Sequence, residues 1–175
     1  MIGDERGITL TELMVALAIT GLITGILATA MYQINQVTGW GNNELRVQHD
    51  LQNAATWLNR DVRRASSAHV VSASQMILTV PYDVYSTMTG TVTIYARVIT
   101  YTLTDSTLTR DSDGSTLIVA RHVNSFIPSP TGMVTSVITI TITSAITSQV
   151  GDVAGSATLH LDMRPEPTPT PTVSP

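Results

Sequence analysis

A long uncharged stretch, Leu13–Asn43, lies near the start of this 175-residue chain. Its first part, Leu13–Met31, contains only aliphatic residues and methionine apart from three threonines and two glycines. A helix of this length is about 30 Å long, which is the thickness of the hydrocarbon core of a bilayer. The sequence therefore predicts a membrane-spanning helix at the N-terminal end, and the remaining residues are enough for one modest domain.

Glu12 stands directly before this stretch. A carboxylate placed inside the hydrocarbon core costs on the order of 3 kcal/mol on insertion scales. A helix that served only as an anchor would be better with leucine at this position, so we expect the carboxylate to have a partner. The alternative is a solvated carboxylate at the headgroup boundary that has no specific role.

The residues around Glu12 read GITLTEL at positions 7–13, followed by MVALAITGLI. The glycine, the Thr-Leu and Glu-Leu pairs and the apolar tail resemble, at this spacing, the N-terminal signature of type IV pilins and type II secretion pseudopilins. The resemblance implies that a membrane-embedded prepilin peptidase cleaves after Gly7 and methylates the new terminal amine of Ile8. It also implies that Glu12 faces the terminal amine of a neighbouring subunit during assembly.

Two features depart from that signature. Residue 8 is isoleucine, where the family more often has phenylalanine or methionine, but the side chain stays apolar. In the leader, Arg6 is outweighed by Asp4 and Glu5, so charge gives little information on orientation. The cytoplasmic placement of the N-terminus therefore follows from the resemblance alone.

Other interpretations of the N-terminal segment fit less well. A secretory signal peptide has a basic start and a shorter apolar stretch followed by a small-residue cleavage site. A plain membrane anchor fits the length but leaves Glu12 unexplained. Gly21 and Gly25 form a G-x-x-x-G pair, which is either a packing stripe against neighbouring helices or the ordinary small-residue content of a membrane helix.

Residues 39–43, GWGNN, predict a kink or break, because each of the two glycines costs about 1 kcal/mol in a helix interior. Beyond them, apolar residues recur in steps of three and four, which predicts an amphipathic helix over 44–66 that lies on the following sheet. Its expected apolar face holds Leu45, Leu51, Ala54, Ala55, Leu58, Val62 and Ala65, and its expected polar face includes Asp50, Asn53, Arg60, Asp61 and Arg64.

From Val70 onwards the alternation of apolar and polar residues favours strands. In VITITITS, residues 137–144, the isoleucines face one way and the threonines the other, which is typical of a half-buried strand. The expected strands are 76–80 (ending at Pro81), 91–103 (as one strand or two), 107–110, 116–123, 137–144 and 157–163, with turns at 104–106 and 111–114. The stretch 99–123 also resembles the globular domain of minor pilins and J-type pseudopilins.

Composition excludes several functions. The chain has no cysteine, so it has no disulfides, thiolate metal sites or cysteine nucleophiles. Its net charge of −4 argues against nucleic-acid binding. The sequence shows neither a G-x-S-x-G elbow nor a His-Glu-x-x-His pair, and Asp111-Ser112-Asp113-Gly114 fits a hairpin turn better than a calcium loop. We therefore predict no catalytic residues, no cofactor and no metal site.

The C-terminal residues 165–175 contain five prolines, which precludes helix and sheet and predicts an extended, largely disordered tail. Its Thr-Pro repeats either carry O-glycans or remain unmodified.

The expected fold is α+β and pilin-like: a long N-terminal membrane-spanning helix, then an amphipathic helix packed on an antiparallel β-sheet domain. The expected segments are a leader at 1–7, a hydrophobic assembly helix at 8–38, a kink and amphipathic helix at 39–66, the β domain at 67–163 and the Pro/Thr-rich tail at 164–175.

The expected function is that of a structural subunit, a minor pilin or pseudopilin, of a type IV pilus or type II secretion-like filament. Its partners would be a prepilin peptidase, other pilin or pseudopilin subunits and the cytoplasmic membrane, with the C-terminal domain extracytoplasmic before assembly. The alternative is a single-pass anchored β domain that acts as an adhesin or binding module. A hydrolase on a membrane stalk has little support.

Overall fold

The computed structural model describes residues 9–87, 90–149 and 151–164. The chain divides into two compact units, Met1–Asn42 and Asn43–Pro175. The expected leader at 1–7 and residues 165–175 of the expected tail lie outside the described residues.

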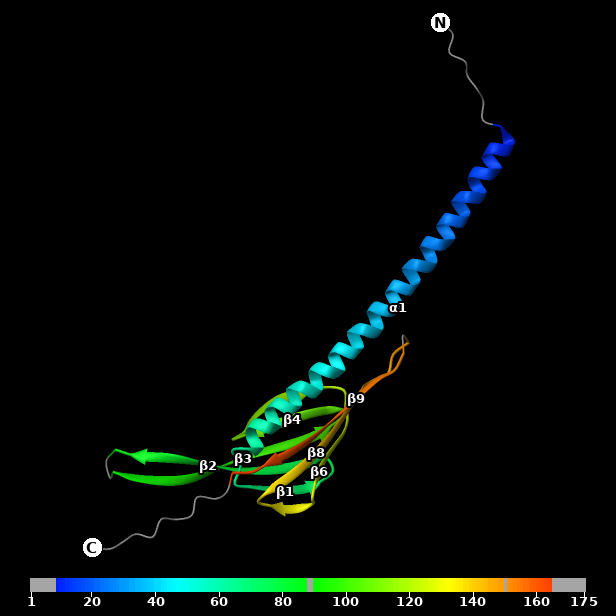
Figure 1. Ribbon diagram of the computed structural model, residues 1–175. Coiled ribbons are helices and arrows are strands. Elements are labelled where there is room, and N and C mark those ends of the chain that lie inside the picture. Colours follow the sequence, from blue (N-terminus) through cyan, green and yellow to red (C-terminus); the bar gives the residue numbers. More distant parts are fainter. Residues whose placement is uncertain (1–8, 88–89, 150, 165–175) are drawn as a thin grey trace, which may run out of the picture. The chain divides into compact units, whose positions relative to one another are not determined.

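One long helix is followed by antiparallel strands (Figure 1), which confirms the predicted α+β, pilin-like architecture. The helix is α1 (Leu10–Val62). The strands are β1 (Ser67–Ser72), β2 (Gln75–Ser86), β3 (Thr91–Thr104), β4 (Thr107–Ser112), β5 (Ser115–Ala120), β6 (Val123–Ser129), β7 (Gly132–Val134), β8 (Val137–Ile146) and β9 (Val153–Asp162).

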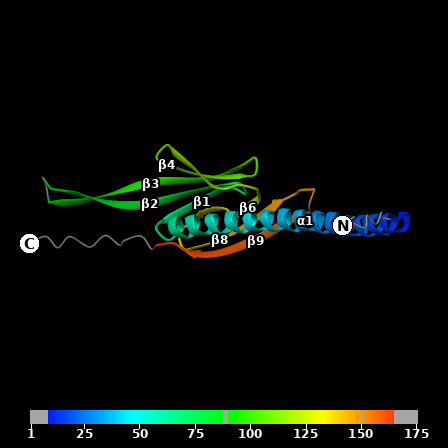
Figure 2. The same ribbon diagram turned by 90° about the horizontal axis from the view of Figure 1, so that it is seen from above.

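The strands form two sheets. One has the order β5-β4-β3-β2-β1-β7 and the other the order β6-β8-β9, and all pairings are antiparallel. Figure 2 shows β2 and β3 in one layer and β8 and β9 in the other. The two layers bury a shared core, because side chains from both sheets belong to one cluster of buried residues.

The C-terminal part of α1 contributes to this core. Ala54, Leu58 and Val62 are fully buried against strands of both sheets, as the sequence predicts for the apolar face of an amphipathic helix. Leu45 was expected on that face, but it is 66% exposed, and Val47 is buried instead.

Of the kink or break predicted at residues 39–43, the break is wrong, because these residues are helical and α1 runs through them. Two glycines cost about 2 kcal/mol in a helix interior. A break would create two new helix ends, each with unsatisfied backbone groups, so continuing the helix is the less costly solution.

Asp61 was predicted on the polar face of the helix, yet it is only 2% exposed. Its Oδ2 accepts a hydrogen bond from the Tyr101 hydroxyl at 2.7 Å and one from Arg110 Nε at 2.5 Å. Its other oxygen, Oδ1, accepts a bond from Arg60 Nε at 3.3 Å. The three donors compensate the buried carboxylate and tie the last turns of α1 to β3 and β4.

The same cluster shifts the pKa values of two of its members. Burial, reinforced by the negative charge of Asp61, raises the pKa of Tyr101 above its usual range. Burial opposes the charge on Arg110, but the hydrogen bond and the attraction to Asp61 outweigh it and raise the pKa of Arg110.

Two strand boundaries also differ from the prediction. β2 continues through Pro81 instead of ending there, because β1 pairs with β2 only as far as Thr79 and leaves an open edge where proline is tolerated. The expected strand 116–123 divides after Ala120: β5 ends there, His122 has a φ of 56°, and β6 begins at Val123 in the other sheet.

The remaining predicted strands are present, but β4 extends to Ser112 and β9 begins at Val153 instead of residue 157. Residues 91–104 form one strand, and Ile138, Ile140 and Ile142 are buried on β8 as the alternation in 137–144 predicts. The turn predicted at 111–114 is shorter, because Asp111 and Ser112 still belong to β4 and only Asp113 and Gly114, both at positive φ, join β4 to β5. Asp111 accepts a hydrogen bond from Gly114 N at 3.3 Å. The turn is therefore a hairpin turn.

Candidate processing and assembly site

The first described residues form a hydrogen-bonded cap at the start of α1. Oε2 of Glu12 accepts hydrogen bonds from the backbone N–H and from the hydroxyl of Thr9, both at 3.0 Å. In return, Thr9 Oγ1 accepts a bond from the backbone N–H of Glu12 at 3.3 Å. This is a capping box, in which a threonine and a glutamate three residues apart satisfy each other's backbone donors.

The cap gives Glu12 a partner within its own chain. The sequence predicts a partner for this carboxylate in a neighbouring subunit. The local signal for the cap was present in the sequence, since Thr9-x-x-Glu12 before an apolar run is the S/T-x-x-E pattern of a capping box. The pairing of Glu12 with a neighbouring subunit stays a prediction, as does its alternative, a solvated carboxylate at the headgroup boundary.

The cap does not use the whole carboxylate. Both bonds from Thr9 go to Oε2, so Oε1 takes neither of them. Glu12 lies beside Val15, Ala16 and Ile19 along one exposed side of the helix. A hydrogen-bond donor from outside the chain could therefore approach Oε1 along the exposed apolar side chains that follow Glu12 on the helix.

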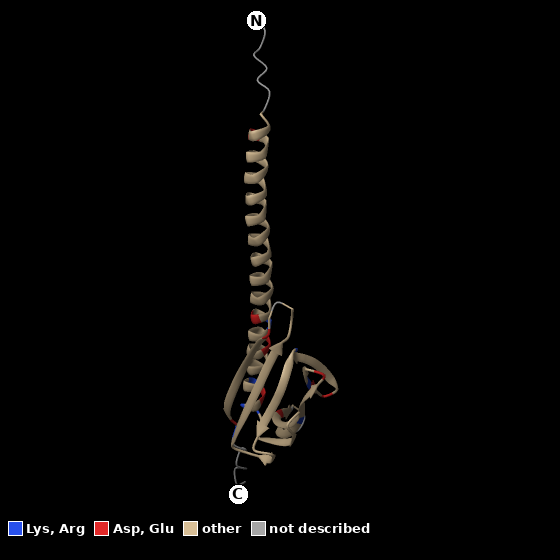
Figure 3. Cartoon of the chain, turned by 90° about the vertical axis from the view of Figure 1, so that its right-hand side faces the viewer, with Lys and Arg blue, Asp and Glu red and all other residues tan. Residues whose placement is uncertain are grey.

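The helix that follows Glu12 is long and apolar enough to cross a membrane by length and composition. Figure 3 shows its long charge-free part, and between residues 9 and 42 no residue is buried. Thr20, Thr24 and Thr29 each donate their hydroxyl to the carbonyl four residues earlier, at 2.8, 2.8 and 2.9 Å. These hydroxyls are therefore satisfied without water, as a lipid environment requires.

Gly21 and Gly25 lie on this helix. A Cβ atom added at either position would meet nothing within 4 Å. Nothing in the described chain therefore requires glycine at these two positions, and a packing role against other helices stays a prediction. Gly7 and Ile8, the predicted processing residues, lie outside the described residues.

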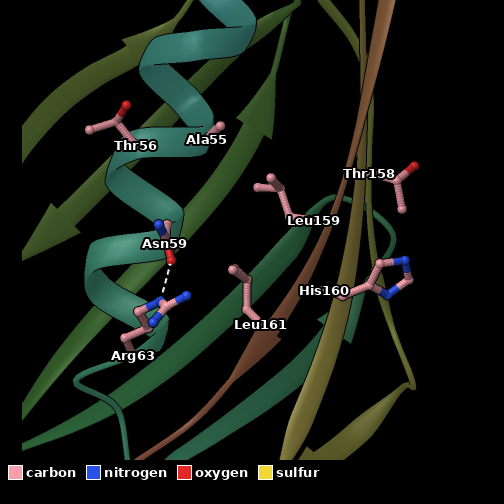
Figure 4. A pocket seen from close by; sticks show the side chains of 8 residues that line it. All are labelled: Ala55, Thr56, Asn59, Arg63, Thr158, Leu159, His160 and Leu161. Atoms are coloured by element: carbon pink, nitrogen blue, oxygen red, sulfur yellow. Dashed lines mark hydrogen bonds between the residues drawn. The ribbon is translucent and has the colours of Figure 1, made fainter.

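A groove on the C-terminal unit has no comparable chemistry. Figure 4 shows it between α1 and β9, lined by Ala55, Thr56, Asn59, Arg63, Thr158, Leu159, His160 and Leu161. Arg63 Nε donates to Asn59 Oδ1 at 2.6 Å, and the His160 ring points away from the helix and lies 3.0 Å from Thr139 Oγ1. The histidine ring therefore contacts β8 and is turned away from the groove.

Residues 9–87, 90–149 and 151–164 contain no group of three or more histidine, aspartate or glutamate side chains placed to hold a metal ion.

Residues 3–28 match the family model of the prokaryotic N-terminal methylation motif. The N-terminal segment of the chain is therefore type IV pilin-like. The motif supports processing of the chain by a prepilin peptidase. The apolar helix of this pilin-like chain is consistent with membrane anchoring. No curated protein and no solved structure matches the chain.

Proposed function

We propose that the chain is a minor pilin or pseudopilin, a structural subunit of a type IV pilus or type II secretion-like filament. A prepilin peptidase cleaves it after Gly7 and methylates Ile8, with the N-terminus on the cytoplasmic side and the C-terminal unit outside. The observation that carries this proposal is the methylation motif at residues 3–28, which extends into an apolar helix that the described chain leaves uncovered.

Assembly follows from the exposure of that helix. An apolar helix with no cover in its own chain needs lipid or other helices around it, and leaving lipid for a filament requires neighbours. Gly21 and Gly25 would let a neighbouring helix approach closely, because neither position is filled within the chain.

Glu12 would then have two partners. Thr9 holds Oε2 within the chain, and the terminal ammonium of a neighbouring subunit's Ile8 would bind Oε1. In a medium of low dielectric the ammonium and the carboxylate attract strongly, and each removes the other's cost of leaving water. The lone subunit is thereby less stable in lipid than the assembled one.

Three variants separate capping from pairing. Glu12→Gln keeps a carbonyl oxygen for the cap, as glutamine does in capping boxes, but removes the charge. Glu12→Leu removes both the cap and the charge. Thr9→Val removes the threonine hydroxyl and keeps the charge.

We expect all three variants to be cleaved after Gly7. We expect both Glu12 variants to enter filaments about tenfold less than the wild type, which corresponds to about 1.4 kcal/mol of contact energy, whereas Thr9→Val stays near wild type. The measurements are crosslinking in detergent-solubilised membranes and subunit counts in sheared filaments.

Normal incorporation of Glu12→Leu would refute the pairing. Poor incorporation of Thr9→Val together with normal incorporation of Glu12→Gln would assign the role to the cap. A cleavage defect in the Glu12 variants would move the role of this residue to the peptidase step. An anchored adhesin or binding module, in contrast, would keep its leader and be indifferent to all three changes.

A further inference from the structure

The outer parts of β2 and β3 form a two-stranded arm, defined here as Val80–Ser86 and Thr91–Val98. Figures 1 and 2 show these parts extending away from the other strands. β1 pairs with β2 only up to Thr79, and β4 pairs with β3 only from Ile99. Among the described residues, therefore, no further strand pairs with either edge of the arm. A two-stranded ribbon alone is at best marginally stable in water.

Both faces of the arm carry exposed apolar and aromatic side chains. Tyr82, Val84, Tyr85, Val92, Ile94, Tyr95 and Val98 are each between 42% and 62% exposed. Surfaces of this kind on a soluble domain mark a binding site. The question is what covers them.

One face of the arm continues the core side of the sheet. Register places Leu78 opposite Ile99, both buried in the core, and the next pairs on that face are Val80 with Arg97 and Tyr82 with Tyr95. The Tyr82 and Tyr95 rings stack, with centroids 5.8 Å apart. We call this side, which ends with Val84 and Thr93, the tyrosine face.

The C-terminal tail leaves the described structure at the base of the arm, from the core side. Met163 belongs to the buried core, and the N–H of the next residue, Arg164, bonds to the carbonyl of Ala65 at 3.0 Å. The residue after Ala65, Ser66, donates its N–H to the carbonyl of Thr79 at 2.9 Å. Thr79 directly precedes the arm, so the tail begins within a few residues of the tyrosine face.

The tail has the length and chemistry to cover this face. Seven residues of strand span about 23 Å, and the eleven residues 165–175 span about 34 Å as a polyproline II helix. Proline-rich segments in this conformation dock on surfaces lined with aromatic side chains and lose little entropy on binding. The prolines lack the N–H groups needed to add a strand, so the contact is with side chains and not with the open edges.

Charge fits the same arrangement. Arg97 lies at the base of the tyrosine face, 5.5 Å from the centroid of the Tyr82 ring. It already bonds Asp113 at 2.8 Å, but a guanidinium has further N–H groups to offer. Glu166 is the second residue of the tail and would arrive at this level.

We propose that the Pro/Thr-rich tail, residues 165–175, docks along the tyrosine face of the β2–β3 arm of its own chain. It covers the aromatic pair and leaves the opposite face, with Tyr85, Val92 and Ile94, open. This interaction does not depend on the proposed function, since it lies within the C-terminal unit.

The absence of cysteine from the chain allows a clean crosslinking test. Thr93 lies on the tyrosine face and Val92 on the other, and both are exposed. At the spacings given above, Thr170 reaches the level of Thr93. The pair Thr93→Cys with Thr170→Cys is therefore compared with the control pair Val92→Cys with Thr170→Cys, in the full chain, diluted in detergent and mildly oxidised.

We expect the Thr93 pair to form the intramolecular disulfide at least about fivefold faster than the Val92 pair, because docking raises the effective concentration on one face only. Equal rates for the two pairs would overturn the proposal. Crosslinks that form only between chains would also overturn it and assign the face to a second copy.

A second measurement does not use cysteine. Ending the chain after Arg164 should speed hydrogen exchange of backbone amides in the arm several-fold while leaving exchange in β8 unchanged. Unchanged exchange in the arm would contradict docking, and faster exchange in β8 would show that the tail acts on the domain as a whole.

Discussion

The two units of the chain differ in whether they bury their apolar side chains. In residues 9–42 no side chain is buried, although most are apolar, whereas the C-terminal unit has a core shared by one helix and two sheets. The same helix, α1, serves both units, so the helical conformation does not account for the difference. A helix with a covered face belongs to a self-sufficient domain, and an apolar helix without cover depends on lipid or on other chains.

The largest effect should come from separating the units. A chain that begins at Asn43 loses the uncovered apolar helix and keeps every buried residue of the core. We expect it to be soluble without detergent and to show mixed helix and strand, with strand dominant, by circular dichroism. If it is insoluble or unfolded in benign buffer, the C-terminal unit is not self-sufficient and the comparison fails.

The next largest effect should come from the buried charge cluster. Asp61→Ala leaves Arg110 without its carboxylate in a partly buried site, and breaking a buried pair in this way costs about 3–5 kcal/mol of unfolding free energy. Urea unfolding of the full chain in detergent measures it. Asp113→Asn is the matched control, because asparagine tolerates the positive φ of this turn residue. The pair of Asp113 with Arg97 is about half exposed and should contribute at most about 1 kcal/mol. Equal losses for the two variants would contradict the assignment of Asp61 to the core.

Two glycines give a direct comparison of covered and uncovered backbone. A Cβ atom at Gly155 on β9 would lie 3.0 Å from Leu51 Cδ1 and 3.1 Å from Val47 Cγ1, so Gly155→Val should cost about 1–3 kcal/mol by overpacking. Gly21→Ala meets nothing in the chain, so it should be neutral or stabilise the helix by up to about 1 kcal/mol. Ala154→Val, at the exposed neighbour of Gly155, is the control and should be neutral.

If the Gly21→Ala subunit is stable but enters filaments poorly, residue 21 is in contact with other chains in the filament. A loss of stability in the isolated subunit would contradict the open surface at this position.

Alkaline pH should lower the free energy of unfolding by a smaller amount, which grows gradually with pH. The pKa of Tyr101 is raised in the folded chain, so folding holds the phenol in its protonated form. Its contribution to stability is complete below the unfolded pKa of about 10 and declines as pH rises above it, by at most about 1.4 kcal/mol per pH unit. Urea unfolding between pH 9 and 11 measures this slope. Tyr101→Phe should flatten the slope, and an unchanged slope would show that other groups cause it.

Much of this contrast was predictable from the sequence, because it depends on local pattern. The uncharged run after Glu12 predicts the uncovered helix, and the alternating isoleucines at 138, 140 and 142 predict a half-buried strand. The capping box of Thr9 and Glu12 also has a local signature in the sequence, the S/T-x-x-E pattern.

The remaining features depend on residues far apart in the sequence. Asp61 looks like a surface residue because its partners Tyr101 and Arg110 lie on later strands. The division of the predicted strand 116–123 between two sheets follows from the turn at His122, which no local pattern indicates. Continuation of α1 through Gly39 and Gly41 depends on the cost of new helix ends, which a count of glycines omits.

The central claim is that the uncovered helix belongs to a subunit prepared for assembly by cleavage and methylation. The intact mass of the protein recovered from its native host tests this claim most directly, since residues 1–7 are either present or absent. We expect a chain that begins at Ile8 and carries one added methyl group on its terminal amine. A chain that retains Met1, in membranes that contain an active prepilin peptidase, would contradict the account.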